Sequence, residues 1–263
     1  MILITRISRQ AGWCAVSGAL IRPLVCGTAA LGCANRPAQP RAAVPHEIML
    51  RRLLDMLGFT LDINDYVLRV QAELNRLNLD EVRQLSDLLY RAWKDGRFVF
   101  VFGNGGSATT ASHIAEDLGK TCQGKLHPED PSERRMKVLS LTDNAGWLTA
   151  LGNDLGYDQV FVQQLMHYAG PGDLAIAISG SGNSPNVLTA VEWANRRGLT
   201  TFGMTGYDGG KLKRLQRAGF HVPLDDMALV ETLHLCAAHW IVDDLCARIN
   251  GRGRYEQGLG TRD

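Results

Sequence analysis

The sequence has no apolar run as long as the about 18 residues that a membrane-spanning helix needs. It also has no excess of charge, because 28 Lys and Arg stand against 27 Asp and Glu and leave a net charge of +1. A balanced charge gives no overall field that would draw the chain to nucleic acid or to an anionic membrane, so we expect neither as a partner. With 263 residues, of which 45% are hydrophobic and 21% charged, the chain is expected to form one large globular domain with extensions.

Several common site motifs are also missing. The six cysteines form no CxxC or CxxH pair, which disfavours zinc ribbons and thioredoxin-like proteins. We interpret them as reduced thiols and therefore expect a cytoplasmic protein. There is no GxxxxGK[ST] motif, and no GxGxxG motif followed by an acidic residue for a ribose, so we expect no nucleotide cofactor.

The first 46 residues contain no Asp or Glu but several arginines, and they are rich in Ala, Gly, Cys and Pro. A signal peptide is one interpretation, but Arg22-Pro23 interrupts its apolar stretch. Ala30-Leu31-Gly32-Cys33 loosely resembles a lipoprotein cleavage box, and a transit peptide would also be rich in Arg and poor in acids. We favour a fourth interpretation, in which residues 1–46 are a disordered or non-native extension.

Residues 47–250 have the pattern of an ordered domain, followed by a flexible tail at 251–263. Apolar residues at three- and four-residue spacing predict amphipathic helices from Leu61 to Leu77 and from Leu79 to Trp93. Short apolar runs then alternate with helical segments, and a last helix is predicted from about Met227 to Ile249. The runs are Phe98–Phe102, Val138–Leu141, Leu174–Ile178, Thr201–Met204 and, more weakly, His221–Leu224. This order predicts a three-layer αβα sandwich, in which a five-stranded parallel sheet is preceded by two helices.

Three loops that follow predicted strands are rich in glycine and in polar side chains. They are Gly103-Asn104-Gly105-Gly106-Ser107, Ser179-Gly180-Ser181-Gly182-Asn183-Ser184-Pro185 and Thr205-Gly206-Tyr207-Asp208-Gly209-Gly210. In open parallel sheets ligands bind beyond the carboxyl ends of the strands, where glycines allow close approach and helix N-terminal amides favour an anion. A single loop of this kind would be interpreted as a tight turn with a helix cap, but three together predict a phosphate-ester site.

With these motifs the chain resembles the SIS (sugar isomerase) domain family over residues 60–250, and within it the phosphoheptose isomerases. The other motifs that carry the resemblance are His113-Ile114-Ala115-Glu116-Asp117, Gly152-Asn153-Asp154-Leu155-Gly156-Tyr157, and Glu231, His234 and His239 in the last helix. The resemblance implies an isomerase that converts sedoheptulose 7-phosphate into D-glycero-D-manno-heptose 7-phosphate through an enediol. Such a product would feed lipopolysaccharide or other heptose-containing glycans.

The resemblance also implies roles for individual residues. It places the catalytic base at Asp117 and the acid at His239. It implies that the phosphate is held by Ser179, Gly180, Ser181 and Ser184. It implies that the remaining substrate contacts come from Asn104, Gly105, Gly106, Ser107, Asn153, Asp154 and Glu231.

The chain departs from the best-known members of the family, which carry Glu where Asp117 stands and Gln where Glu231 stands. Asp is one methylene shorter than Glu, so the neighbouring Glu116 is an alternative base, although it lies about 100° away around the helix. In several phosphoheptose isomerases these positions bind Zn²⁺, and His113, Asp117, Glu231 and His239 are all competent ligands. Enediol chemistry needs no metal, so a zinc site and a metal-free acid–base cluster stay equally open.

The family resemblance further implies a homotetramer, and we expect the active sites to be assembled between subunits. The last helix carries more apolar residues than one sheet face needs, namely Leu229, Val230, Leu233, Ala237 and Trp240. The alternative function is a non-catalytic phosphosugar-binding regulator of the same family, of the replication-initiator-associating type. A sensor need not keep both Asp117 and His239, so their presence favours the isomerase.

Overall fold

The computed structural model describes residues 56–122 and 134–256 of the chain. The predicted extension at residues 1–46 lies outside these ranges, as do residues 47–55, 123–133 and the last seven residues. The division into residues 1–46, 47–250 and 251–263 therefore stays a prediction. Within the described ranges, no helix combines the length and the hydropathy that crossing a membrane requires.

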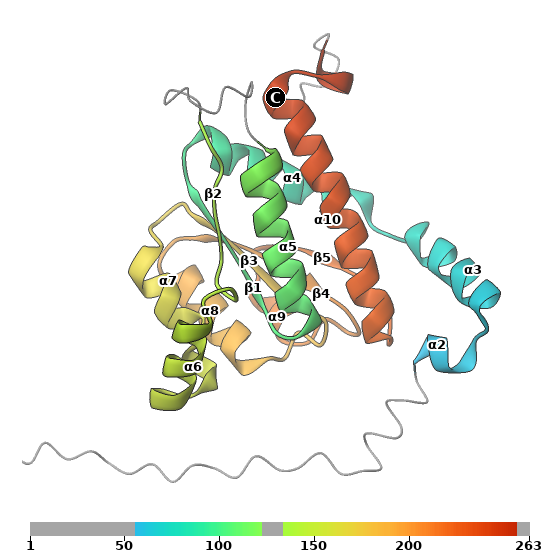
Figure 1. Ribbon diagram of the computed structural model, residues 1–263, viewed down its shortest axis with the longest axis horizontal. Coiled ribbons are helices and arrows are strands. Elements are labelled where there is room, and N and C mark those ends of the chain that lie inside the picture. Colours follow the sequence, from blue (N-terminus) through green and yellow to red (C-terminus); the bar gives the residue numbers. More distant parts are fainter. Residues whose placement is uncertain (1–55, 123–133, 257–263) are drawn as a thin grey trace, which may run out of the picture. The chain divides into compact units, whose positions relative to one another are not determined.

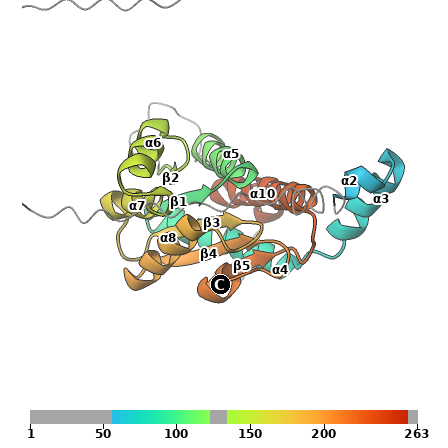
Figure 2. The same cartoon turned by 90° about the horizontal axis from the view of Figure 1, so that it is seen from below.

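Five parallel strands form one sheet in the order β2-β1-β3-β4-β5, as Figures 1 and 2 show. The strands are β1 (Phe98–Gly103), β2 (Lys137–Ser140), β3 (Leu174–Ser179), β4 (Thr200–Thr205) and β5 (Ala218–His221). The first four lie where the apolar runs predict them. The fifth begins three residues before the predicted run at His221, because β5 is an edge strand in which only Phe220 is buried. The predicted five-stranded parallel sheet is confirmed.

Helices cover both faces of this sheet. In chain order they are α2 (Leu57–Thr60), α3 (Ile63–Leu74), α4 (Leu79–Lys94), α5 (Gly106–Thr121), α6 (Ala145–Asp154), α7 (Val162–Tyr168), α8 (Pro185–Arg196), α9 (Leu212–Leu215) and α10 (Met227–Asn250), with short 3₁₀ turns η1 (Tyr157–Gln159) and η2 (Gly253–Tyr255). The two predicted N-terminal helices correspond to α3 and α4. Asp62 and Asn78 cap them by accepting hydrogen bonds from the backbone amides of the first turn.

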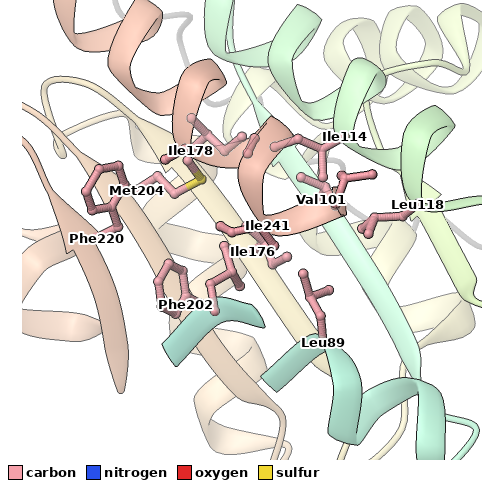
Figure 3. Packing of buried hydrophobic residues seen from close by; sticks show 14 of the residues in the cluster. Leu89, Val101, Ile114, Leu118, Ile176, Ile178, Phe202, Met204, Phe220 and Ile241 are labelled. Carbon is pink, nitrogen blue, oxygen red and sulfur yellow. The ribbon is translucent and has the colours of Figure 1, made fainter. Parts of the chain in front are cut away.

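The alternation of side chains along the strands divides the core into two layers. Val99 and Val101 of β1 pack with α4, α5 and α10, whereas Phe100 and Phe102 pack on the opposite face with α7 and α8. Figure 3 shows the first layer, where Ile241 of α10 lies among side chains of the central strands. The three-layer αβα sandwich is therefore confirmed.

Helices α5 and α10 lie side by side on one face of the sheet (Figures 1 and 2). The Cys122 thiol lies 3.7 Å from the carbonyl oxygen of Val242, and the Cys246 thiol lies 3.4 Å from that of Thr121. These contacts join the carboxyl-terminal part of α5 to the carboxyl-terminal half of α10. The two helices therefore run in the same direction, and both begin at the carboxyl edge of the sheet.

Candidate active site

The loop after β1 turns sharply into α5 at two glycines. Gly105 has a φ of 56° and precedes the helix, a backbone conformation that favours glycine. Gly106 opens the helix, and a Cβ atom there would lie 2.2 Å from Oε2 of Glu231 on α10. The carboxylate of Glu231 therefore rests directly on the first turn of α5. Ser107, which follows in the helix and is also a predicted substrate contact, is buried.

Glu231 is half-buried, and this burial raises the pKa of its carboxyl group above the ordinary value. Among the described residues, none forms a hydrogen bond or an ion pair with the Glu231 carboxylate. A carboxyl group in this state accepts a proton more readily than an exposed one. It is also available to contact a ligand that enters beside Gly106.

A second group of side chains lies further along the same two helices. Nε2 of His113 lies 3.3 Å from Oδ2 of Asp117, one turn later on α5, and 3.4 Å from Nε2 of His239 on α10. The two imidazole rings meet edge to face with centroids 5.0 Å apart. Asp117 is mostly shielded from solvent, whereas His113 and His239 are exposed. The predicted acid and base are thus brought together, with His113 between them.

This group has the donor set of a catalytic zinc site. One ligand atom from each of His113, Asp117 and His239 lies within 4.8 Å of the others. Two nitrogen ligands at about 2.1 Å from a tetrahedral Zn²⁺ would be about 3.4 Å apart, which agrees with the 3.4 Å between the two Nε2 atoms. Glu231, the fourth expected ligand, is not part of this group and lies two turns nearer the start of α10.

Glu116 and Lys120 pair with each other on the exposed side of α5. The ammonium group of Lys120 lies 2.6 Å from Oε1 of Glu116 and 4.0 Å from Oδ1 of Asp117. The hydrogen bond from Lys120 lowers the pKa of Glu116 below its ordinary value. Glu116 is thus paired with Lys120, whereas the carboxylate of Asp117 contacts His113.

The loop between β3 and α8 has the features of an anion site. The hydroxyl oxygens of Ser179 and Ser184 lie 3.3 Å apart, and the Gly182 amide donates to the carbonyl of Ser179 across the turn. Ser184 precedes α8, but its side chain does not cap the helix. Pro185 has no N–H and the amide of Val187 donates to Oδ1 of Asn186, so the Ser184 hydroxyl and the amide of Asn186 are the groups available to an anion at this end of α8.

The loop after β4 supports the loop after β3. The amide of Gly206 donates to the carbonyl of Gly180, and the amide of Leu212 donates to that of Gly182. The amide oxygen of Asn183 accepts from the amide of Lys211. The two loops therefore hold each other in place, which explains why both have the composition of a ligand-binding loop.

Two further residues contact the first loop: Asn186, which the sequence patterns do not single out, and Tyr157, which belongs to the motif at 152–157. The Asn104 and Asn186 side chains exchange two hydrogen bonds of 2.9 Å, so the loop after β1 is tied to the first turn of α8. The hydroxyl of Tyr157 donates to the same oxygen of Asn104. Asn186 is 2% exposed, and its position two residues after Ser184 is the signal that could have identified it.

The predicted residues Asn153 and Asp154 lie apart from these contacts, at the end of α6. The amide of Asn153 donates to Oδ1 of Asp154, and both side chains are exposed. Among the described residues no hydrogen bond joins them to the phosphate loop or to the His113 group. His234 of α10 is fully buried and faces the sheet, where its Nε2 lies 3.2 Å from the carbonyl oxygen of Thr205.

Residues 63–206 match the family model described as SIS domain. The chain belongs to the SIS domain family. Within the family it is 33% identical to a phosphoheptose isomerase of Bradyrhizobium sp. (strain ORS 278) over 192 residues, which is 71% of this chain and 93% of that relative. It is 36% identical to a phosphoheptose isomerase of Aquifex aeolicus over 163 residues, or 62% of this chain and 82% of the relative.

Solved structures give the same result for this SIS domain. A phosphoheptose isomerase from Neisseria gonorrhoeae superposes with a TM-score of 0.61 at 29% identity, covering 68% of this chain and 91% of that protein. A phosphoheptose isomerase from Francisella tularensis superposes with a TM-score of 0.62 at 25% identity, covering 70% and 95%. The resemblance inferred from the sequence motifs is confirmed.

Proposed function

We propose that this SIS domain protein is a phosphosugar aldose–ketose isomerase that converts sedoheptulose 7-phosphate into D-glycero-D-manno-heptose 7-phosphate. The observation that carries the proposal is the contact of Asp117 with His113 and of His113 with His239. The relatives named phosphoheptose isomerase, which match the chain over most of their length, supply the substrate class.

In the proposed reaction Asp117 is the base and His239 the acid. Asp117 takes a proton from C1 of the ketose while His239 donates a proton to the carbonyl oxygen at C2, which gives the enediol. Asp117 then returns its proton to C2, and the hydroxyl proton on C1 goes back to His239 as the aldehyde forms. His113 lies between the two groups and contacts both of them through its Nε2, so it would position both side chains.

The proposal assigns phosphate binding to the loop Ser179–Ser184. Its hydroxyl groups and the amide of Asn186 lie at one helix N-terminus, where the helix dipole also favours an anion. Asn104, Gly105, Gly106 and Ser107 would line the sugar on one side and Glu231 on the other. Asn153 and Asp154 are proposed to close the pocket from α6.

A Zn²⁺ site is the alternative to this metal-free acid–base pair, because the same His and Asp side chains could hold a metal ion. His113, Asp117 and His239 would hold the ion, and Glu231 would reach it after a change of its side-chain position. When bound, zinc would polarise the carbonyl oxygen of the substrate as a Lewis acid. The protein groups would then serve to hold the sugar and to place its C1 and C2 protons.

The proposal includes a homotetramer that acts in the cytoplasm and supplies heptose for lipopolysaccharide or other glycans. Four of the five apolar residues of α10 expected at an interface, Leu229, Val230, Leu233 and Ala237, are buried in the chain's own core, and only Trp240 is exposed. Exposed apolar surface instead gathers on α2 and α3. Phe59, Ile63 and Leu68 are 64%, 71% and 61% exposed. We propose that these side chains are buried against other copies of the chain in the oligomer.

The deciding experiment is proton exchange between substrate and D₂O, followed by NMR. The Asp117→Asn variant should exchange the C1 and C2 protons about 10²–10⁴-fold more slowly than the wild type, while the matched Glu116→Gln variant should exchange at nearly the wild-type rate. A wild-type rate in Asp117→Asn would show that Asp117 is not the base. Binding of sedoheptulose 7-phosphate without any exchange in the wild type would favour the phosphosugar-binding regulator. Loss of exchange on chelation, restored by Zn²⁺, would establish the metal.

A further inference from the structure

A hollow of about 360 Å³ opens at the free edge of the sheet, and none of its lining residues is one proposed to bind the phosphosugar. It lies where β2 ends, between the start of α6 and the end of α7. The residues that line it are Leu139, Ser140, Asp143, Asn144, Ala145, Trp147, Gln164 and Tyr168. None of them is Lys, Arg or His, and Asp143 is the charged residue among them.

The carboxylate of Asp143 is held in a fixed position. Its Oδ1 accepts a short hydrogen bond from the hydroxyl of Ser112 on α5 and lies 3.2 Å from the hydroxyl oxygen of Thr142. Its Oδ2 has no hydrogen-bond or ion-pair partner among the residues that the structure describes. A carboxylate that is oriented through one oxygen offers the other oxygen to a ligand that can donate a hydrogen bond.

Gln164 presents a second fixed acceptor from the floor of the hollow. This side chain is 3% exposed, and its Nε2 donates to the carbonyl oxygens of Leu141 at 2.9 Å and Val160 at 2.8 Å. Both amide hydrogens are thereby used, which fixes the orientation of the amide group and turns Oε1 away from those carbonyls. In the described part of the chain no donor is bonded to Oε1, so this acceptor is free to take a hydrogen bond from water or from a ligand in the hollow.

Aromatic rings form one wall of the hollow. The Trp147 and Tyr168 rings lie nearly parallel, with an interplanar angle of 23° and centroids 5.8 Å apart. The Trp147 backbone is fixed as well, because its amide donates to the side chain of Asn144 at the start of α6. Electron-rich aromatic faces attract a cation, and the attraction is strengthened when a carboxylate lies in the same site.

We propose that this hollow is a second ligand site, which binds a small organic cation through an ammonium or guanidinium group. The cation would donate hydrogen bonds to Oδ2 of Asp143 and Oε1 of Gln164 while its carbon atoms pack against Trp147. A phosphate group is excluded, because it would meet the Asp143 carboxylate with no cationic side chain to compensate. The site is therefore chemically opposite to the phosphate loop at Ser179–Ser184.

The test compares three probes of equal length that differ in charge: n-butylammonium, 1-butanol and butyrate. Binding to the full-length protein is measured by saturation-transfer NMR and calorimetry in phosphate buffer, which contains no competing amine. The wild type should bind n-butylammonium saturably, 1-butanol more weakly, and butyrate not at all. Equal binding of 1-butanol and n-butylammonium would mean an apolar or polyol site, and absence of saturable n-butylammonium binding would overturn the proposal.

Variants then locate the site. Asp143→Asn keeps the acceptor for Ser112 but removes the charge, so it should weaken n-butylammonium binding by about 10-fold or more. Trp147→Leu should weaken it by about 3-fold or more. The matched control is Asp158→Asn, which removes an exposed carboxylate elsewhere on the same side of the sheet and should leave the affinity unchanged. An unaltered affinity in Asp143→Asn, or an equal loss in Asp158→Asn, would show that the cation binds somewhere else or through net charge alone.

Discussion

The buried His234 should make the stability of the protein depend on pH. Its Nε2 lies 3.2 Å from the carbonyl oxygen of Thr205, and its Nδ1 is buried with no partner among the described residues. Protonation would therefore place a charge and an unsatisfied N–H group inside the core. Burial lowers the pKa of His234 from 6.5 to about 4.

The direction of the pH dependence follows from which state of the chain binds the proton. Between pH 6.5 and about 4 the unfolded chain binds a proton at His234 and the folded chain does not, so acid favours unfolding. The stability contribution is fully present above pH 6.5 and is lost as the pH falls towards 4. A difference of about 2.5 pKa units, at about 1.36 kcal/mol each, corresponds to about 3 kcal/mol.

The assay is urea unfolding followed by circular dichroism between about pH 7.5 and pH 4, at one protein concentration throughout. His234→Gln retains an amide donor for the Thr205 carbonyl but does not titrate. Between these pH values, the free energy of unfolding of this variant should therefore decrease by about 3 kcal/mol less than that of the wild type. The exposed His167, changed to Gln, is the matched control and should follow the wild-type profile. Parallel profiles for the wild type and His234→Gln would refute the reasoning.

Three further predictions concern the site and the assembly. Replacing Ser181 and Ser184 together by Ala should raise KM for the phosphosugar with little change in the free energy of unfolding, and an unchanged KM would reject the phosphate loop. Gly106→Ala should displace the Glu231 carboxylate, because the new Cβ would lie 2.2 Å from its Oε2. Its kinetic defect should match that of Glu231→Ala and should not add to it in the double variant, whereas additive losses would mean that the two act separately. Ile63→Glu should lower the oligomeric state in sedimentation analysis, because Ile63 is 71% exposed and lies on the apolar face proposed to contact other copies.

The fold was predictable where burial leaves a strong pattern. β1 and β3 are covered on both faces, so nearly every residue in them is apolar and the sequence marks their positions clearly. β5 was misplaced because it is held at the sheet edge by backbone pairing with β4, and the apolar residues that follow it are not part of the strand. An edge strand with one buried side chain has no comparable signal.

The candidate site was predictable in its loops but not in its cross-helix contacts. Glycine and serine at strand ends identify the loops after β1 and β3 from sequence alone. The contact of His113 with His239 depends on the packing of α5 against α10, which periodicity does not give, and only the family resemblance indicated it. The same packing places Glu231 over Gly106, a contact that a spacing of eight residues from His239 could not reveal.

The pairing of Asn104 with Asn186 bears on how the protein ages. Asn104 is followed by Gly105, and an Asn-Gly pair deamidates readily when the glycine nitrogen can attack the asparagine side-chain carbonyl. Here that carbonyl oxygen accepts hydrogen bonds from Asn186 and Tyr157, and the side-chain nitrogen donates to Asn186, so the amide is held by three bonds. Breaking these bonds would expose the pair to deamidation, which would introduce a negative charge beside the first turn of α8, where phosphate binding is proposed. The three bonds thus protect the chemical integrity of the chain as well as its conformation.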